Sequence, residues 1–255
     1  MPETAIRIEP LGEGRRILVS DAHRFGTDAF LLANFADPHR DWNAVDLGTG
    51  CGIIPTLWLG KGCVRTCLGI EISEEACELA RKTAKINDDT LRFEVLQLDL
   101  RELRCDGSGS KYEIDRERFD LVVCNPPYFI EQSGYVSPDP QRARARSELS
   151  CSVEDVCEAA RYLLRYGGRL CMCHRPERLP DVICAMRAKG IEPKRMRMIQ
   201  QRPEKAPWLV LIEGRRGAGK QLDILPPMFM QKEDGSPSDE LEAMYGCYRD
   251  GRAGK

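Results

Sequence analysis

The stretch "NAVDLGTGCGIIPTLWLG", residues 43–60, decides the fold. Its first part, 43–48, is apolar and predicts a buried strand, and 52–60 predicts a short helix. Between them lie Gly48, Gly50 and Gly52. Glycine lets the backbone turn tightly and approach a ligand that faces the helix N-terminus. The stretch therefore predicts an α/β unit with a ligand site where the strand ends.

The same alternation of strand and helix continues outward from this stretch. Apolar periodicity and caps such as Ser73 and Ser152 predict helices at 73–87, 152–168 and 177–190. Further strands are predicted at 66–72, 91–99, up to Cys124, 169–174, 192–200 and 206–216. Such alternation predicts an α/β fold with a mostly parallel sheet and helices on its faces, and the last strand is expected to be antiparallel.

The flanking segments divide the chain into three parts. Residues 1–22 predict a hairpin that turns at Gly12–Gly14, and 28–36 predict a helix with Thr27 or Asp28 as its N-cap. We expect residues 1–36 to be an extension on a main domain of residues 37–230. The polar residues 231–255 are expected to form a tail, either a loosely attached helix or a frayed end.

Composition limits the class of protein. The chain has 255 residues, which is enough for one α/β domain with appendages. Its 38 basic and 40 acidic side chains nearly cancel, so affinity for nucleic acid must come from local clusters. The N-terminal "PETAIRIEP" has no apolar core of a signal peptide, and no apolar run reaches membrane-spanning length. We expect a cytoplasmic protein without membrane contact, and a monomer.

The twelve cysteines raise the question of disulfides and metals. Many of them, such as Cys67, Cys124 and Cys171, lie among apolar strand residues, so reduced and buried thiols are predicted. The stretches "CVRTC" (63–67) and "CMCH" (171–174) lack the paired spacing of zinc sites. No bound metal is expected.

Three acidic residues accompany the glycine-rich turn. Asp46 precedes the turn, where a carboxylate disfavours phosphate and favours a cationic sulfonium or ammonium group. Glu71 ends the second strand, where it can accept hydrogen bonds from ribose hydroxyls, and Asp99 ends the third, where it can accept from an adenine amine. Each acid alone could be a cap or a surface group. Together they predict a nucleoside site. A nicotinamide oxidoreductase is disfavoured, because the third glycine of its G-x-G-x-x-G fingerprint would stand at position 53, where this chain has Ile53.

The fourth strand ends in a second motif, "VVCNPPYF" (122–129). Pro126 and Pro127 stop the strand because they lack a backbone N–H. They hold Asn125 and Tyr128 at its carboxyl end. A rigid strand-ending turn over a buried aromatic is the alternative interpretation.

With both motifs in this order, the sequence resembles the class I S-adenosylmethionine-dependent methyltransferases that methylate amino groups, from about Phe25 to Glu213. The resemblance implies a Rossmann-like, seven-stranded sheet and S-adenosylmethionine as cofactor, bound with the help of Asn125 as well as the glycines and acids above. Asn125 and Pro126 would accept hydrogen bonds from the target amino group, so that the nitrogen lone pair faces the sulfonium methyl. Tyr128 would stack on a planar base.

This motif leaves the acceptor open among adenine N6 in DNA or RNA, guanine N2 and a protein glutamine amide. The stretches "HRFGTDAFLLANFA", "RARARSELS" and "PWLVLIEGRRGAGKQLDILPPMF" resemble bacterial tRNA adenine-N6 methyltransferases that modify the base 3′ to the anticodon of a valine tRNA. That resemblance implies that Gly26, Thr27 and Asp28 help to close the cofactor pocket. A glutamine methyltransferase would need more chain before residue 43, and intact Asn125 speaks against a non-catalytic nucleoside-binding module.

Local charge independently favours tRNA as the partner. Residues 187–220 are rich in Lys and Arg, and arginines alternate in the loop after the "NPPY" motif. Such clusters contact phosphates without reading sequence, although each could also be only a solvated face. The predicted RNA-binding residues are Arg142, Arg144, Arg146, Arg195, Arg197, Lys205, Arg215 and Arg216.

Overall fold

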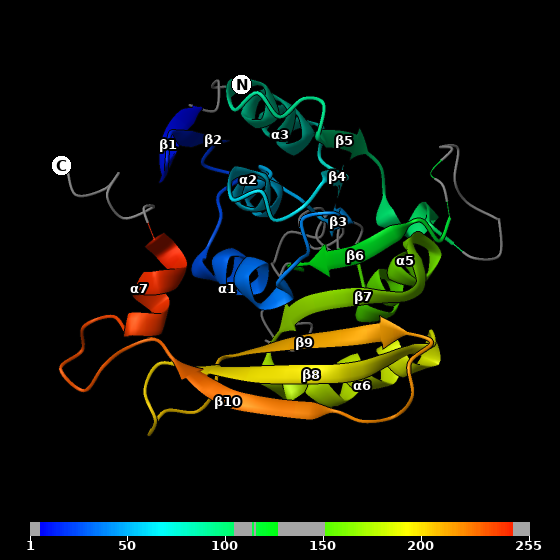
Figure 1. Cartoon of the computed structure of the whole chain (residues 1–255), viewed down its shortest axis with the longest axis vertical. Coiled ribbons are helices and arrows are strands. Elements are labelled where there is room, and N and C mark those ends of the chain that lie inside the picture. The colour runs from blue at the N-terminus through cyan, green and yellow to red at the C-terminus, as the bar shows by residue number, and fades with distance from the viewer. Residues whose placement is uncertain (1–5, 105–113, 115, 127–150, 247–255) are drawn as a thin grey trace, which may run out of the picture.

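A sheet of eight strands, in the order β10-β8-β9-β7-β6-β3-β4-β5, forms the centre of the computed structural model (Figure 1). The structure describes residues 6–104, 114, 116–126 and 151–246. The strands are β3 (Asn43–Leu47), β4 (Thr66–Glu71), β5 (Phe93–Gln97), β6 (Phe119–Cys124), β7 (Leu164–His174), β8 (Ile191–Gln200), β9 (Leu209–Arg216) and β10 (Asp223–Phe229). Neighbours from β5 to β7 pair in parallel, and β9 lies antiparallel between β7 and β8. This α/β arrangement confirms the predicted fold class.

The eighth strand corrects the predicted number of seven. β10 pairs in parallel with β8 at the edge of the sheet. Its sequence "DILPPMF" contains Pro226 and Pro227, which cannot donate to a neighbouring strand. The pairing shifts register between Leu225 and Met228, so the prolines are accommodated at an irregularity of an edge strand. This strand was not predicted from the sequence, because two prolines interrupt its pattern of apolar residues.

Helices cover both faces of the sheet. One face carries α1 (Thr27–Ala36), α2 (Ile53–Gly60), α3 (Glu74–Ile86) and the hairpin of β1 (Arg7–Gly12) and β2 (Arg15–Val19). The opposite face carries α5 (Val153–Leu163), α6 (Leu179–Ala188) and the short 3₁₀ helix η1 (Leu100–Glu102), with η2 (Pro176–Arg178) leading into α6. Alternate residues of the central strands enter the two cores: Leu121 and Val123 of β6 face α1, and Val122 and Cys124 face α5.

The helix ends agree in part with prediction. Ser73 caps α3, and Ser152 caps α5 in a reciprocal pair with Asp155. The N-cap of α1 is Gly26 rather than Thr27 or Asp28, and no side chain caps this helix. The helix predicted at 152–168 ends at 163, because Leu164 already pairs with Phe119 of β6.

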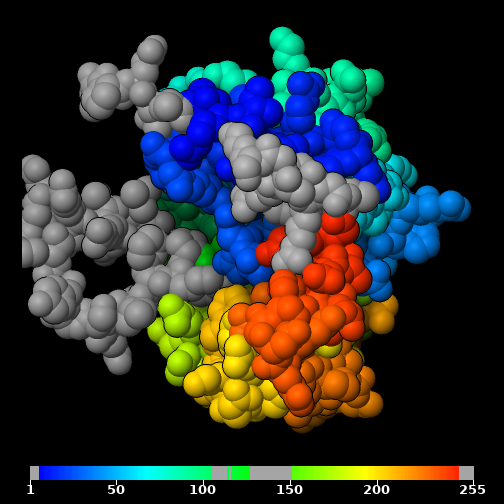
Figure 2. Space-filling view, turned by 90° about the vertical axis from the view of Figure 1, so that its left-hand side faces the viewer, coloured from blue at the N-terminus to red at the C-terminus, as the bar shows by residue number. Residues whose placement is uncertain are grey.

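A C-terminal helix, α7 (Asp239–Tyr245), packs beside α1 (Figure 1). Leu241 and Met244 are buried in the same core as α1, and the Tyr245 ring lies 4.8 Å from the ring of Phe30. Figure 2 shows the C-terminal residues, in orange and red, on the same side of the molecule as the N-terminal residues in blue. Residues 239–245 therefore belong to the packed core, and residues 247–255 lie outside the described part of the chain.

Candidate active site

The predicted functional residues meet where the parallel strands end. Leu47 of β3 is level with Cys124 of β6 and with Ile70 of β4, and Glu71 is level with Gln97 of β5. Gly48, Glu71, Asp99 and Asn125 each lie at or just beyond these positions. In open α/β sheets, ligands bind at this edge. We call it the carboxyl edge of the sheet.

The glycine-rich turn has a backbone that requires glycine. Gly48, Gly50 and Gly52 have φ angles of 71°, 55° and 85°. A Cβ atom at Gly52 would lie 2.9 Å from the Phe93 ring, so this glycine also permits close packing of the turn on β5. A Cβ at Gly48 or Gly50 would meet no described atom within 4 Å. The turn therefore presents bare backbone at the carboxyl edge.

Glu71 connects the turn to the end of β4. Its carboxylate accepts a hydrogen bond from the Gly50 N–H at 3.0 Å and another from the Ser73 N–H at 2.9 Å. The side chain is half-buried, and the two bonds fix its position beside the glycine-rich turn.

Asp46 lies beneath the turn and is only 2% exposed. The Thr49 hydroxyl donates to its carboxylate at 2.8 Å. Burial raises the pKa of Asp46 to about 7 and outweighs the hydrogen bond from Thr49, which lowers it; the nearby Glu71 carboxylate adds a smaller upward contribution. Near neutral pH both the charged and the neutral form of Asp46 are therefore populated.

Asp99 is paired with Arg101. The carboxylate accepts from the Arg101 backbone N–H at 2.9 Å and from its guanidinium at 2.6 to 3.0 Å. Partial burial alone would raise the pKa of Asp99, but these hydrogen bonds outweigh it and hold the pKa below its ordinary value. Asp99 is thus a carboxylate at neutral pH, in place at the end of the third strand.

The segment before α1 reaches the same edge. His23 Nε2 lies 3.4 Å from the Ser73 hydroxyl, just beyond Glu71. Gly26 is exposed, the Thr27 hydroxyl lies 2.8 Å from the Tyr245 hydroxyl, and the Asp28 carboxylate accepts from the Ala29 N–H at 3.0 Å. The C-terminal helix α7 therefore holds the first residue of α1.

Asn125 follows β6 directly, and its side-chain oxygen accepts a hydrogen bond from the Cys173 thiol at 3.0 Å. Pro126, the next residue, is buried. Pro127 and Tyr128 lie outside the described residues, so their predicted roles stay predictions.

The predicted RNA-binding residues separate into groups. Three arginines have partners within the chain: Arg195 pairs with Glu213 at 2.8 Å, Arg197 with Glu240, and the buried Arg216 with Glu117. Arg215 is exposed and donates to the Gly167 carbonyl. In strand register it lies opposite Arg169 of β7, which is level with Leu121 in the first half of β6, so Arg215 is away from the carboxyl edge.

Lys205 has a different location. It is exposed in the loop between β8 and β9. Ile199 near the end of β8 is level with Leu209 at the start of β9, and both lie at the carboxyl edge, next to the end of β7. The basic cluster of residues 187–220 therefore divides between opposite edges of the sheet. Arg142, Arg144 and Arg146 lie outside the described residues.

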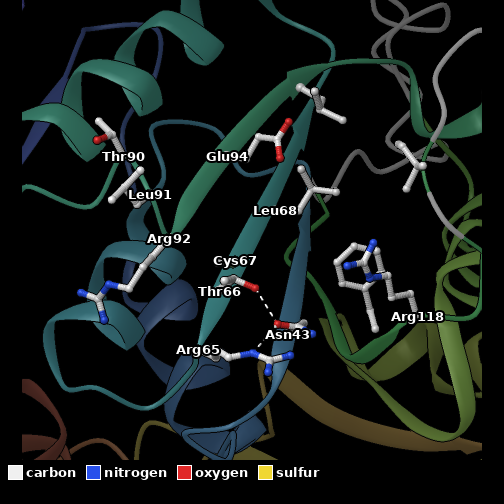
Figure 3. Close-up of a pocket in the computed structure, with 13 residues that line it drawn as sticks. Asn43, Arg65, Thr66, Cys67, Leu68, Thr90, Leu91, Arg92, Glu94 and Arg118 are labelled. Atoms are coloured by element: carbon white, nitrogen blue, oxygen red, sulfur yellow. Dashed lines mark hydrogen bonds between the residues drawn. The ribbon is translucent and has the colours of Figure 1, made fainter.

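A large open cavity of about 810 Å³ lies at the other edge (Figure 3). Its lining includes Asn43, Thr66 and Phe119, which begin β3, β4 and β6. Figure 3 shows Arg65 and Thr66 bonded to the Asn43 side chain, at 3.1 and 2.7 Å. The cavity is thus separate from the glycine-rich turn. Although it is large, it does not coincide with the predicted ligand site.

The described residues contain no group of three or more His, Cys, Asp or Glu side chains placed to hold a metal ion. Within the same residues, no helix combines the length and apolarity that crossing a membrane requires. The cysteines described, among them Cys171 and Cys173, are free thiols.

Comparison with known proteins decides the family. The methyltransferase small domain family matches residues 21–178. This chain belongs to that family. The match covers both the glycine-rich turn and the "NPPY" motif of this methyltransferase.

Curated relatives of the methyltransferase share most of its length. A protein of Parabacteroides distasonis is 30% identical over 75% of this chain and 76% of its own, and one of Porphyromonas gingivalis (strain ATCC 33277) is 32% identical over 76% and 75%. Both are named tRNA1(Val) (adenine(37)-N6)-methyltransferase.

Solved structures confirm the class I methyltransferase fold. A protein of Agrobacterium tumefaciens described as a predicted O-methyltransferase has a TM-score of 0.67 at 23% identity, with 88% of this chain and 96% of that chain covered. Geranyl diphosphate C-methyltransferase of Streptomyces coelicolor, in complex with S-adenosyl-L-homocysteine, has a TM-score of 0.53 at 12% identity, with 74% and 80% covered. At these identities the likeness concerns the fold alone.

Sequence reasoning missed four residues that form hydrogen bonds with predicted site residues: Thr49, Arg101, Cys173 and Tyr245. Thr49 and Arg101 are close in sequence to the acids that they bind, so a local pattern could have indicated them. Cys173 and Tyr245 are distant in sequence from Asn125 and Thr27. Only strand register and the docking of α7 place them there.

Proposed function

We propose that this methyltransferase transfers a methyl group from S-adenosylmethionine to N6 of an adenine in tRNA, and that the adenine is position 37 of tRNA1(Val). The observation that carries the proposal is the position of Asn125 and Pro126 at the carboxyl edge, one strand from the glycine-rich turn. The names of the curated relatives supply the acceptor.

The residues at the carboxyl edge fit the cofactor. The bare backbone of Gly48 and Gly50 gives room for close approach, and the half-buried carboxylate of Glu71 is suited to ribose hydroxyls. Asp99 is suited to the adenine amine, and the ionised form of Asp46, one of the two forms populated near neutral pH, favours a cationic ligand. Gly26, Thr27, Asp28 and Gly52 complete the proposed set. When bound, S-adenosylmethionine supplies an electrophilic methyl group on sulfur.

Asn125 and Pro126 supply the chemistry on the acceptor side. The lone pair of an adenine amino group is delocalised into the ring, so the nitrogen is a poor nucleophile. Two acceptors, the Asn125 side-chain oxygen and the Pro126 carbonyl, bind its two N–H groups and favour a pyramidal nitrogen. With its lone pair so directed, this nitrogen would accept the methyl group that the cofactor supplies, and its proton would then leave to water.

Contact with the tRNA backbone is assigned to the carboxyl edge. Of the described basic residues predicted for this role, Lys205 is exposed at that edge, and the alternating Arg142, Arg144 and Arg146 follow the "NPPY" motif in sequence. Lys205→Ala should weaken tRNA binding and lower the slope of log affinity against log salt by about one, because one phosphate contact is lost. Arg215→Ala, the matched control at the opposite edge, should leave that slope unchanged.

The test is methylation of a tRNA1(Val) transcript, followed by nucleoside mass spectrometry. The wild-type protein should form N6-methyladenosine on a transcript with adenine at position 37, and none on a transcript with guanine there. Asn125→Ala should lower kcat about 100-fold, while the Kd for S-adenosylmethionine, to which Asn125 is one contributor among several, should rise by less than about ten-fold. Asn125→Asp, which keeps an acceptor oxygen, should lower kcat by a smaller factor.

Other outcomes would redirect the assignment. Equal methylation of the transcript with guanine at position 37 would refute the proposed position. Cofactor binding without methylation of any tRNA would refute tRNA as the acceptor and direct the search to DNA and protein amides.

A further inference from the structure

Strand register places Cys173 beside Asn125. Val123 of β6 is level with Cys171 of β7, and Cys124 with Met172, so the next pair of positions along the two parallel strands is Asn125 and Cys173. Both side chains lie on the face of the sheet that α1 covers. The Cys173 sulfur lies 3.0 Å from Asn125 Oδ1, and Cys173 has no exposed surface.

The chemistry of the two groups fixes which end of the amide faces the sulfur. A thiol is a weak donor and a weak acceptor, whereas an amide oxygen is a strong acceptor and an amide NH₂ is a donor only. The thiol therefore pairs best with Oδ1, and the reversed amide would place an NH₂ group against a poor acceptor inside the core. An amide oxygen accepts two hydrogen bonds, so a bond from the thiol is compatible with a bond from the substrate.

We propose that Cys173 is a positioning residue for methyl transfer, which holds the Asn125 amide with its oxygen directed for the target amino group. This inference rests on the proposed function of Asn125 and adds the residue that orients it. Loss of the thiol removes a donor that favours this orientation of the amide, so a larger fraction of the protein presents the NH₂ group to an amino group that is itself a donor. Such a flip lowers the fraction of competent enzyme without changing cofactor binding.

The experiment compares Cys173→Ala, which removes the donor, with Cys173→Ser, which keeps one. The expected result is a kcat about three- to ten-fold lower for Cys173→Ala, the loss typical of one neutral hydrogen bond. Its KM for tRNA and Kd for S-adenosylmethionine should stay within about two-fold of wild type, and Cys173→Ser should restore most of kcat. The matched control is Cys157→Ala on α5, an equally buried cysteine in the other core, which should leave kcat unchanged.

A second measurement does not depend on the acceptor. The side-chain NH₂ signals of Asn125 in a ¹⁵N NMR spectrum, assigned through Asn125→Asp, should shift or broaden in Cys173→Ala and stay near their wild-type positions in Cys173→Ser and Cys157→Ala. If wild type fails to methylate tRNA but this shift appears, the proposed function fails and the positioning contact stands.

Two results would overturn the inference about Cys173. One is a Cys173→Ala variant with wild-type kcat and unchanged Asn125 signals. The other is an equal loss of kcat in the alanine and serine variants together with weaker cofactor binding, which would indicate a packing defect.

Discussion

Replacing Asp46 by asparagine should remove a pH dependence from the stability of the protein. The Asp46 carboxylate is buried beneath the glycine-rich turn, and burial raises its pKa to about 7. Asparagine has nearly the same shape, keeps an oxygen for the Thr49 hydroxyl and carries no charge. The substitution therefore changes the charge and little else.

The magnitude follows from the two pKa values. The carboxyl has an ordinary value of 3.8 in the unfolded chain, so between about pH 4 and about pH 7 the folded state holds a proton that the unfolded state has lost. The contribution of Asp46 to the free energy of unfolding of the wild type falls across this window and is constant outside it. Each pKa unit corresponds to about 1.4 kcal/mol, so the fall amounts to about 4 kcal/mol. Asp46→Asn lacks it.

The assay is urea unfolding of wild type and variant at several values between about pH 4 and about pH 8. The difference in unfolding free energy between Asp46→Asn and wild type should shift in favour of the variant by about 4 kcal/mol from the acid to the neutral end. Asp223→Asn, the same change at an exposed position, is the control for general charge effects. A difference that stays constant across the window would show that Asp46 is ionised at its ordinary pKa and would refute the argument from burial.

Two further substitutions test the turn and the C-terminal helix. Gly52→Ala should lower the free energy of unfolding by about 3 kcal/mol, because the new methyl group meets the Phe93 ring and the backbone there is left-handed. The control Gly62→Ala, also at a left-handed position but with no described atom within 4 Å, should lower it by about 1 to 2 kcal/mol. Equal losses in thermal or urea unfolding would contradict the packing argument. Tyr245→Phe should lower the free energy of unfolding by about 1 kcal/mol, because it removes the hydrogen bond to Thr27. In a double-mutant cycle with Thr27→Val, fully additive losses of stability would exclude that bond.

The sequence predicted most of the fold because local patterns determine it. The strand before Gly48, the capped helices and the strand that ends at Asn125 are each visible as apolar periodicity followed by glycine, proline or a capping residue. The strand β10 was not predicted, because its two prolines remove the pattern and only its position at the edge of the sheet makes them acceptable.

The charges show where sequence proximity misleads. Lys205 and Arg215 are ten positions apart in one basic segment, yet β9 runs between them and places them at opposite edges of the sheet. Arg195 and Arg216 belong to the same segment, but each is held by a carboxylate within the chain. A linear cluster of charge therefore predicts a nucleic-acid surface only after the strand directions are known.

The sequence by itself determined the fold class, the glycine-rich turn and the position of Asn125 at a strand end, because each depends on neighbouring residues and on the backbone freedom of glycine and proline. The tertiary structure alone decided which groups hold that site. Cys173 meets Asn125 because two parallel strands pair in one register, and Tyr245 meets Thr27 because α7 buries its apolar side against α1. Contacts between distant residues depend on packing of the whole chain, and no local pattern encodes them.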